Sequence, residues 1–112
     1  LSKEPLAWVQ SLIDTHVDDV WVQYMAISAW GHQGLWGKTK MAIDALLKRG
    51  SLPATLEARI WLLKATVAEA LEDREGAHEA WKRSAQLQAQ VRLQLSALRT
   101  PAAEPVDQPR LL

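Results

Sequence analysis

The side chains that could carry chemistry in this chain are three histidines and two pairs of adjacent carboxylates, and the chain has no cysteine. A metal site needs convergent ligands, yet no two of His16, His32 and His78 have the i, i+4 spacing of a helical zinc site. Asp18–Asp19 and Glu72–Asp73 stand where helices are predicted to begin, so capping accounts for them without catalysis. We therefore expect no enzyme and no metal centre.

A second group of side chains suits binding rather than reaction. Two sets of residues recur at spacings of three and four, which puts each set on one face of a helix. They are Trp21, Tyr24, Ser28 and His32 and, later in the chain, Arg59, Leu62, Thr66 and Glu69. A trough that mixes aromatic, apolar and charged side chains is typical of peptide-binding surfaces. We expect the two faces to form a groove for a protein or peptide partner; the alternative is that an upstream repeat or the C-terminal tail covers them.

The helices that would position these faces are predicted from residues 59–85. Small side chains recur there at fixed offsets from Trp61, and a second tryptophan, Trp81, stands among them. The small residues are Ala65, Ala68, Ala77 and Ser84. This spacing lets two antiparallel helices approach closely, and it is the tetratricopeptide pattern. Trp61 and Trp81 are then expected in the core, and function is expected to come from a surface.

Periodicity and capping signals predict an all-α fold of about five helices. The expected helices span residues 4–15, 20–32, 35–49, 54–71 and 74–98. Asp18 and Asp19 are expected to cap the second helix, and Asp73 the fifth. Gly31 and Gly34 are expected to stop the second helix, and Gly50 the third. The predicted architecture is a row of antiparallel helical hairpins of tetratricopeptide type.

The second and third helices align with the fourth and fifth as a degenerate copy of the same hairpin. Trp30, Thr39 and Ile43 take the aromatic, small and apolar positions of that copy, whereas Gln23 stands where the later hairpin has Trp61. One helix precedes the two repeats and could be the second half of an earlier one. Such hairpins cannot bury both faces alone, so they stack and leave a concave face open.

The composition changes near the C-terminus. Residues 1–99 form the predicted tetratricopeptide-like helical domain. Residues 100–112 hold three of the five prolines and few periodic apolar residues, so we expect a disordered tail there.

Charge and hydropathy exclude further classes. Lys+Arg and Asp+Glu are both 13, so no global field favours nucleic acid as a partner. No apolar run approaches the roughly 18–20 residues that span a bilayer. Because the chain begins at Leu1, we expect a piece of a longer protein in which any membrane anchor lies upstream. The last predicted helix carries a set of basic residues that fits a solvated face or a weak self-association surface. They are Lys82, Arg83, Arg92 and Arg99.

The run Gly34-Leu35-Trp36-Gly37-Lys38, followed by the hairpin at residues 59–85, resembles the C-terminal tetratricopeptide part of the proteobacterial HemY family. The resemblance covers residues 18–88, and Thr39 departs from the alanine expected after the run. It implies helical repeats behind an N-terminal membrane-anchored region, an association with the bacterial inner membrane, and a role that assists heme and porphyrin biosynthesis without a demonstrated catalytic activity.

Two functions therefore stand as expectations. The first is a non-catalytic interaction or scaffold module that binds a protein partner and needs no cofactor. The alternative, which the resemblance invites, is a heme or porphyrin carrier with His32 as a single axial ligand. His32 lies between Trp30 and Trp36 in the sequence, and these two could line an apolar pocket beside it. His78 is expected to be a solvated helix residue.

Overall fold

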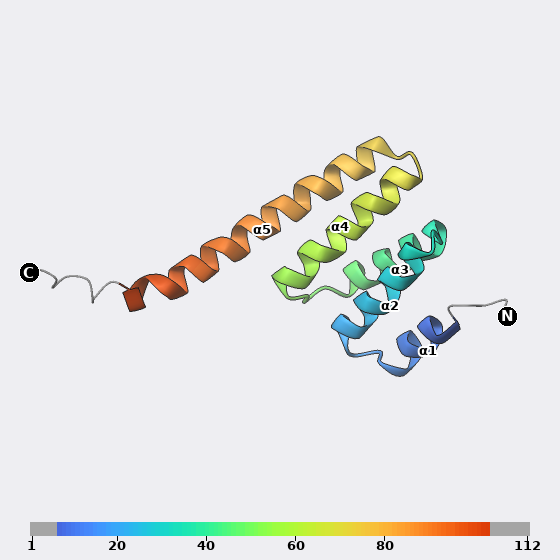
Figure 1. Cartoon of the computed structure of the whole chain (residues 1–112), viewed down its shortest axis with the longest axis horizontal. Helices are drawn as coiled ribbons and strands as arrows, with labels where there is room; N and C mark the ends of the chain where they lie inside the picture. The colour runs from blue at the N-terminus through green and yellow to red at the C-terminus, as the bar shows by residue number, and fades with distance from the viewer. Residues whose placement is uncertain (1–6, 104–112) are drawn as a thin grey trace, which may run out of the picture.

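The computed structural model describes residues 7–103, and their side chains as far as Leu98. Within that range the fold is all-α, with five helices packed in adjacent pairs, which confirms this part of the prediction (Figure 1). The helices are α1 (Ala7–Thr15), α2 (Val20–His32), α3 (Trp36–Arg49), α4 (Ala54–Ala70) and α5 (Arg74–Ala103). Each helix packs on the next, and α4 contacts α2 as well as α3.

The predicted caps and stops explain where the helices begin and end. The Asp19 carboxylate accepts hydrogen bonds from the backbone N–H groups of Trp21 and Val22 at 3.1 and 3.2 Å, so it caps α2. Asp73 does the same for α5 through the N–H of Gly76 at 2.9 Å. Gly34 and Gly50, at φ +76° and +73°, follow α2 and α3 in a conformation that favours glycine. The prediction that Gly31 stops α2 is wrong, because Gly31 lies inside the helix and is buried there.

The helix bounds differ from the prediction mainly at the C-terminal end. Helix α5 continues to Ala103, five residues beyond the expected Leu98, and so includes residues 100–103 of the predicted tail. The rest of that tail, residues 104–112, and the expected first turn, residues 4–6, lie outside the described residues. The disordered tail therefore stays a prediction.

The core lies between α2, α3 and α4, with a smaller cluster under α1. The larger cluster consists of Ile27, Ile43, Leu46, Leu56, Ile60 and Val67. The smaller one joins Val9 of α1 to Ala26 and Trp30 of α2. Buried Gln23 ties the same two helices together, because its amide Nε2 donates to the carbonyls of Ile13 and His16, both at 2.9 Å. Gln23, which occupies the position that Trp61 has in the later hairpin, thus anchors the α1–α2 turn.

The small residues that the offsets placed at the helix crossings are buried. Ala65, Ala77 and Ser84 are at most 5% exposed, and Thr39 is fully buried in the earlier hairpin. Ser84 Oγ donates to the carbonyl of Ala58 at 2.9 Å, so α5 touches the α4 backbone at this point. Only a small side chain permits that approach.

The prediction that Trp81 belongs to the core is wrong. Its side chain is 42% exposed, and its indole N–H lies 3.4 Å from a carboxylate oxygen of Glu69 at the edge of the hairpin. The reason is rotation along the helix, because Trp81 follows the fully buried Ala80 by one residue and is turned about 100° from it. Trp61 is half-buried and donates to Glu57 at 3.2 Å.

Helix α5 is longer than the helix it packs on. Ser84 meets Ala58 of antiparallel α4, so the first residue of α4, Ala54, comes opposite Gln88. Residues 89–103 extend past α4 and are called the α5 overhang below; at 1.5 Å per residue they span about 22 Å. The overhang runs away from the other helices in Figure 1. Among the described residues, no helix combines the length and apolarity needed to cross a membrane.

Candidate partner-binding groove

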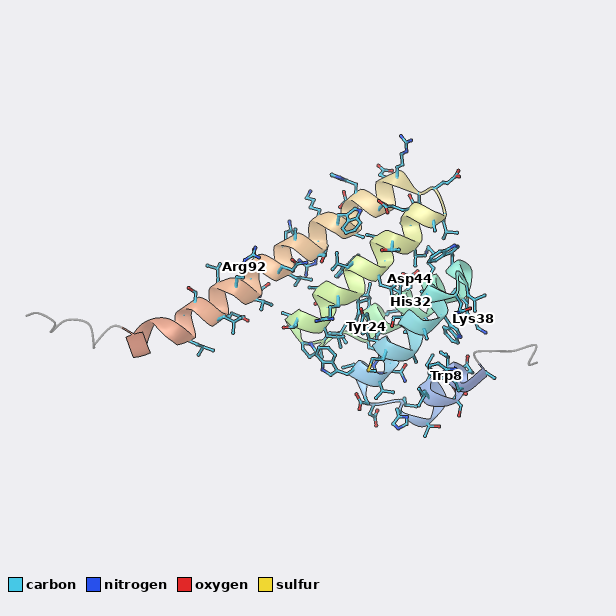
Figure 2. The ribbon with its side chains drawn as sticks, viewed as in Figure 1. Trp8, Tyr24, His32, Lys38, Asp44 and Arg92 are labelled. Carbon is cyan, nitrogen blue, oxygen red and sulfur yellow. The ribbon has the colours of Figure 1, made fainter. Side chains whose placement is uncertain are left out.

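Most of the predicted groove residues line one hollow between α2, α4 and α5. Its volume is about 710 Å³. The lining residues are Tyr24, Ser28 and His32 from α2, Thr55, Ala58, Arg59, Leu62, Leu63 and Thr66 from α4, and Gln88, Val91 and Arg92 from α5. In Figure 2, Tyr24 and His32 lie along α2 beside α4, and Arg92 lies on α5. We call this hollow the groove.

The α2 wall is held in place by local hydrogen bonds. Ser28 Oγ donates to the carbonyl of Met25 at 2.9 Å, and His32 Nδ1 lies 2.8 Å from the carbonyl of Ser28. A ring nitrogen that faces a carbonyl oxygen donates to it, so in the neutral ring Nε2 is the nitrogen that keeps the lone pair. Tyr24 is half-buried and packs against the larger core cluster, so its ring is fixed on one side.

The α4 wall joins an apolar floor to a charged rim. Leu62 and Leu63 are half-buried, and Leu63 packs against the core. Thr66 and Arg59 are exposed; Thr66 returns its hydroxyl to the carbonyl of Leu62 at 3.2 Å. Arg59 therefore lines the groove as an exposed cationic side chain.

The α5 wall was missed by the sequence prediction. Gln88, Val91 and Arg92 complete the groove, together with Thr55, Ala58 and Leu63 of α4, which were also not predicted. The signal was present, because the buried residues Ala77, Ala80, Ser84 and Leu87 recur at spacings of three and four, and the same step leads to Val91. Extending that stripe would have placed Val91 on the same face of α5 as the residues that pack on α4, with Arg92 next to it in the sequence.

Two predicted groove residues lie elsewhere. Trp21 is 43% exposed in the first turn of α2, one turn before Tyr24. Glu69 lies in the last turn of α4, where it accepts from Trp81 and lines a separate hollow at the α4–α5 turn with His78. Both residues share a helix face with groove residues, but each lies beyond the end of the hollow.

The charges of the groove are all of one kind. Its charged lining residues are Arg59 and Arg92, and no described lining residue is Asp or Glu. The ion pairs in the described part of the chain join Asp44 to two lysines and Arg83 to Glu57, so they include neither groove arginine. A carboxylate that entered the groove would meet two guanidinium groups with no competing acid.

Asp44 fixes the α4 wall relative to α3. Its two oxygens each lie 3.0 Å from a lysine, Lys40 on the same helix and Lys64 on α4. Burial alone would raise the pKa of Asp44, but the hydrogen bonds and charges of Lys64 and Lys40 outweigh it and hold the pKa below the ordinary 3.8. The carboxylate is therefore ionised at neutral pH.

The tryptophans next to His32 in the sequence belong to the core instead of the groove. Trp30 is buried against Val9, with Lys38 Nζ 4.8 Å above its ring, and Trp36 packs half-buried against the larger cluster. Across residues 7–103, no group of three or more His, Cys, Asp or Glu residues gathers closely enough to hold a metal ion. Comparison with protein-family models, with curated proteins and with solved structures finds no match for this chain.

Proposed function

We propose that this chain is a non-catalytic tetratricopeptide-type interaction module that binds a peptide segment of a partner protein in the groove. The observation that carries the proposal is that three helices place an aromatic ring, leucines and two arginines around one hollow of about 710 Å³. Half-buried aromatic residues and arginines are the side chains that most often anchor protein interfaces.

The tetratricopeptide assignment draws support from the order of contacts. In such arrays the first helix of a repeat packs on both helices of the preceding repeat. Helix α4 contacts α2 and α3, and α5 contacts α4 closely through Ala77 and Ser84. The groove then corresponds to the concave face, which the first helices of successive repeats line.

The resemblance to the HemY family gives this module a setting. We propose that it belongs to a membrane-anchored bacterial protein linked to heme or porphyrin biosynthesis, and that it scaffolds an assembly at the inner membrane. The membrane anchor would lie outside this chain.

The test is a double variant, Tyr24→Ala with Arg59→Ala. It removes an aromatic and a cationic anchor, so binding of the physiological partner from a cell extract is expected to weaken at least about thirty-fold, or about 2 kcal/mol. The matched control is Trp21→Ala with Arg74→Ala, an aromatic residue of α2 and an exposed arginine that lie outside the groove. If the Tyr24→Ala, Arg59→Ala variant captures the partner as well as the unaltered chain does, the groove is not the binding site.

A second candidate, heme or porphyrin carriage, draws support from the geometry of His32. Its Nδ1 faces the carbonyl of Ser28 at 2.8 Å, the arrangement that orients a histidine and leaves Nε2 for iron. A carrier would shift the Soret band of titrated hemin, and His32→Ala would abolish the shift while His78→Ala would keep it. The absence of a Soret shift with the unaltered chain would eliminate this candidate.

A further inference from the structure

The apolar stripe of α5 continues where α4 no longer covers it. Ala77, Ala80, Ser84 and Leu87 face α4 and are at most 5% exposed. The same spacing of three and four leads to Val91, which is half-buried, and then to two leucines on the overhang, Leu95 and Leu98. These leucines are 55% and 75% exposed, so exposure rises at the point where α4 begins. The overhang thus presents the same packing face as the α4–α5 interface, and no helix among residues 7–103 covers it.

The overhang and the groove share one sign of charge. No Asp or Glu lies between Glu79 and Glu104, whereas Lys82, Arg83, Arg92 and Arg99 fall in this interval, and Arg92 and Arg99 belong to the overhang. The chain as a whole is neutral, so this segment carries a local excess of positive charge. Arg92 of α5 and Arg59 of α4 both line the groove, and neither arginine belongs to an ion pair within the described residues.

We propose that the overhang and the groove together bind an acidic amphipathic helix of the partner protein. Its apolar face covers Val91, Leu95 and Leu98, and its carboxylates contact Arg59 and Arg92. This inference rests on the proposed function and adds the partner's chemistry and secondary structure to it.

A helix is the form that continues the existing interface. Helix α4 already packs antiparallel on the α5 stripe, and a partner helix placed end to end with it would meet the same spacing of side chains. The overhang, about 22 Å long, offers room for about four helical turns.

Charge and shape disfavour two other occupants. A second copy of the chain would bring its own overhang, which repeats the same basic residues and carries no acid to pair with them. A lipid surface selects helices with lysines and arginines along the whole polar face, whereas the overhang presents glutamines there and leads into a concave groove.

The experiment uses the full chain and a fluorescent designed peptide of about 18 residues, with leucines at helical spacing and glutamates on both flanks. A second peptide replaces every glutamate by lysine, and a third shuffles the acidic sequence so that it loses its apolar face. Anisotropy titrations are expected to show binding of the acidic amphipathic peptide and at least about tenfold weaker binding of the other two.

Two variants locate the contact. Leu95→Gln with Leu98→Gln is expected to weaken the acidic peptide at least about tenfold, whereas the control Leu35→Gln with Leu71→Gln, two leucines exposed elsewhere, keeps it. Arg92→Gln is expected to weaken binding and to flatten its salt dependence, and Arg74→Gln to do neither.

Several results would overturn the inference. They are unchanged peptide binding by the leucine variant, equal binding of the lysine peptide, a dimer in sedimentation that the leucine variant abolishes, and competition by anionic phosphatidylserine vesicles. These results leave the proposed function intact if the Tyr24→Ala, Arg59→Ala variant still loses the native partner. If the acidic peptide binds the overhang but the Tyr24→Ala, Arg59→Ala variant still captures the native partner fully, then only the groove is excluded as a partner-binding site.

Discussion

At the scale of single residues, Asp44 shows how one carboxylate holds two helices together. Its two oxygens form ion pairs with Nζ of Lys40 on its own helix and Nζ of Lys64 on α4, both at 3.0 Å. The combined effect of the two lysines lowers the pKa of Asp44 below 3.8. The side chain is 40% exposed, so solvent screens the pair and the contribution to stability is expected to stay below about 1 kcal/mol.

The sign of the pH dependence follows from that lowered pKa. In the unfolded chain Asp44 binds its proton at a higher pH than in the folded chain, so its stabilising effect is present above about pH 4 and disappears as pH falls through the folded pKa. Chemical denaturation between about pH 6 and pH 2.5 is expected to show a shallower acid loss in Asp44→Asn than in the unaltered chain. Identical slopes would mean that the ion pairs do not form in solution.

A second residue-scale prediction concerns the crossing of α4 and α5. Ala77 is 5% exposed, so Ala77→Leu is expected to destabilise the fold by about 1–3 kcal/mol through overpacking. Ala85→Leu on the exposed side of the same helix is the control and is expected to change thermal unfolding little. Equal melting of the two variants would refute the packing at this crossing.

At the scale of helices, the N-terminus of α5 depends on the Asp73 cap. A Cβ added at Gly76 would collide with the Asp73 carboxylate, so alanine at this position forces the capping side chain to shift. Asp73→Ala is expected to cost about 1 kcal/mol. Gly76→Ala is expected to bring no gain alone, and to stabilise α5 by up to about 1 kcal/mol once Asp73 is alanine. A denaturation cycle over the two single variants and the double variant measures this coupling, and additive effects would contradict it.

The helices were largely predictable because their ends carry local signals. Asp19, Asp73, Gly34 and Gly50 act within one turn of their own positions, so the sequence pattern was enough to find them. The α5 wall of the groove was not found, because it depends on how far α5 extends past the end of α4. Local sequence signals do not report the relative lengths of two helices. Trp81 was misplaced for a related reason: its offset fits the repeat, but the rotation of α5 turns it to the edge.

At the scale of the whole molecule, the overhang makes the chain elongated. A compact chain of this length would have a radius of gyration of about 13 Å, whereas this chain has 18.8 Å. Small-angle scattering at low concentration, with the mass checked by sedimentation, is expected to give at least the larger value for a monomer. A value near 13 Å would mean that the overhang folds back onto the other helices.

The two parts of α5 also divide one helix into regions of unequal local stability. Amide hydrogens of residues 74–88 lie in the part that packs on α4, and they open only when that packing is lost. The overhang, residues 89–103, is about as long as the shortest peptides that hold a helix in water, so its amides are expected to exchange with solvent orders of magnitude faster. A single continuous helix would therefore show a protection boundary near Gln88. Slow exchange of amides beyond that boundary would indicate that another helix covers Leu95 and Leu98.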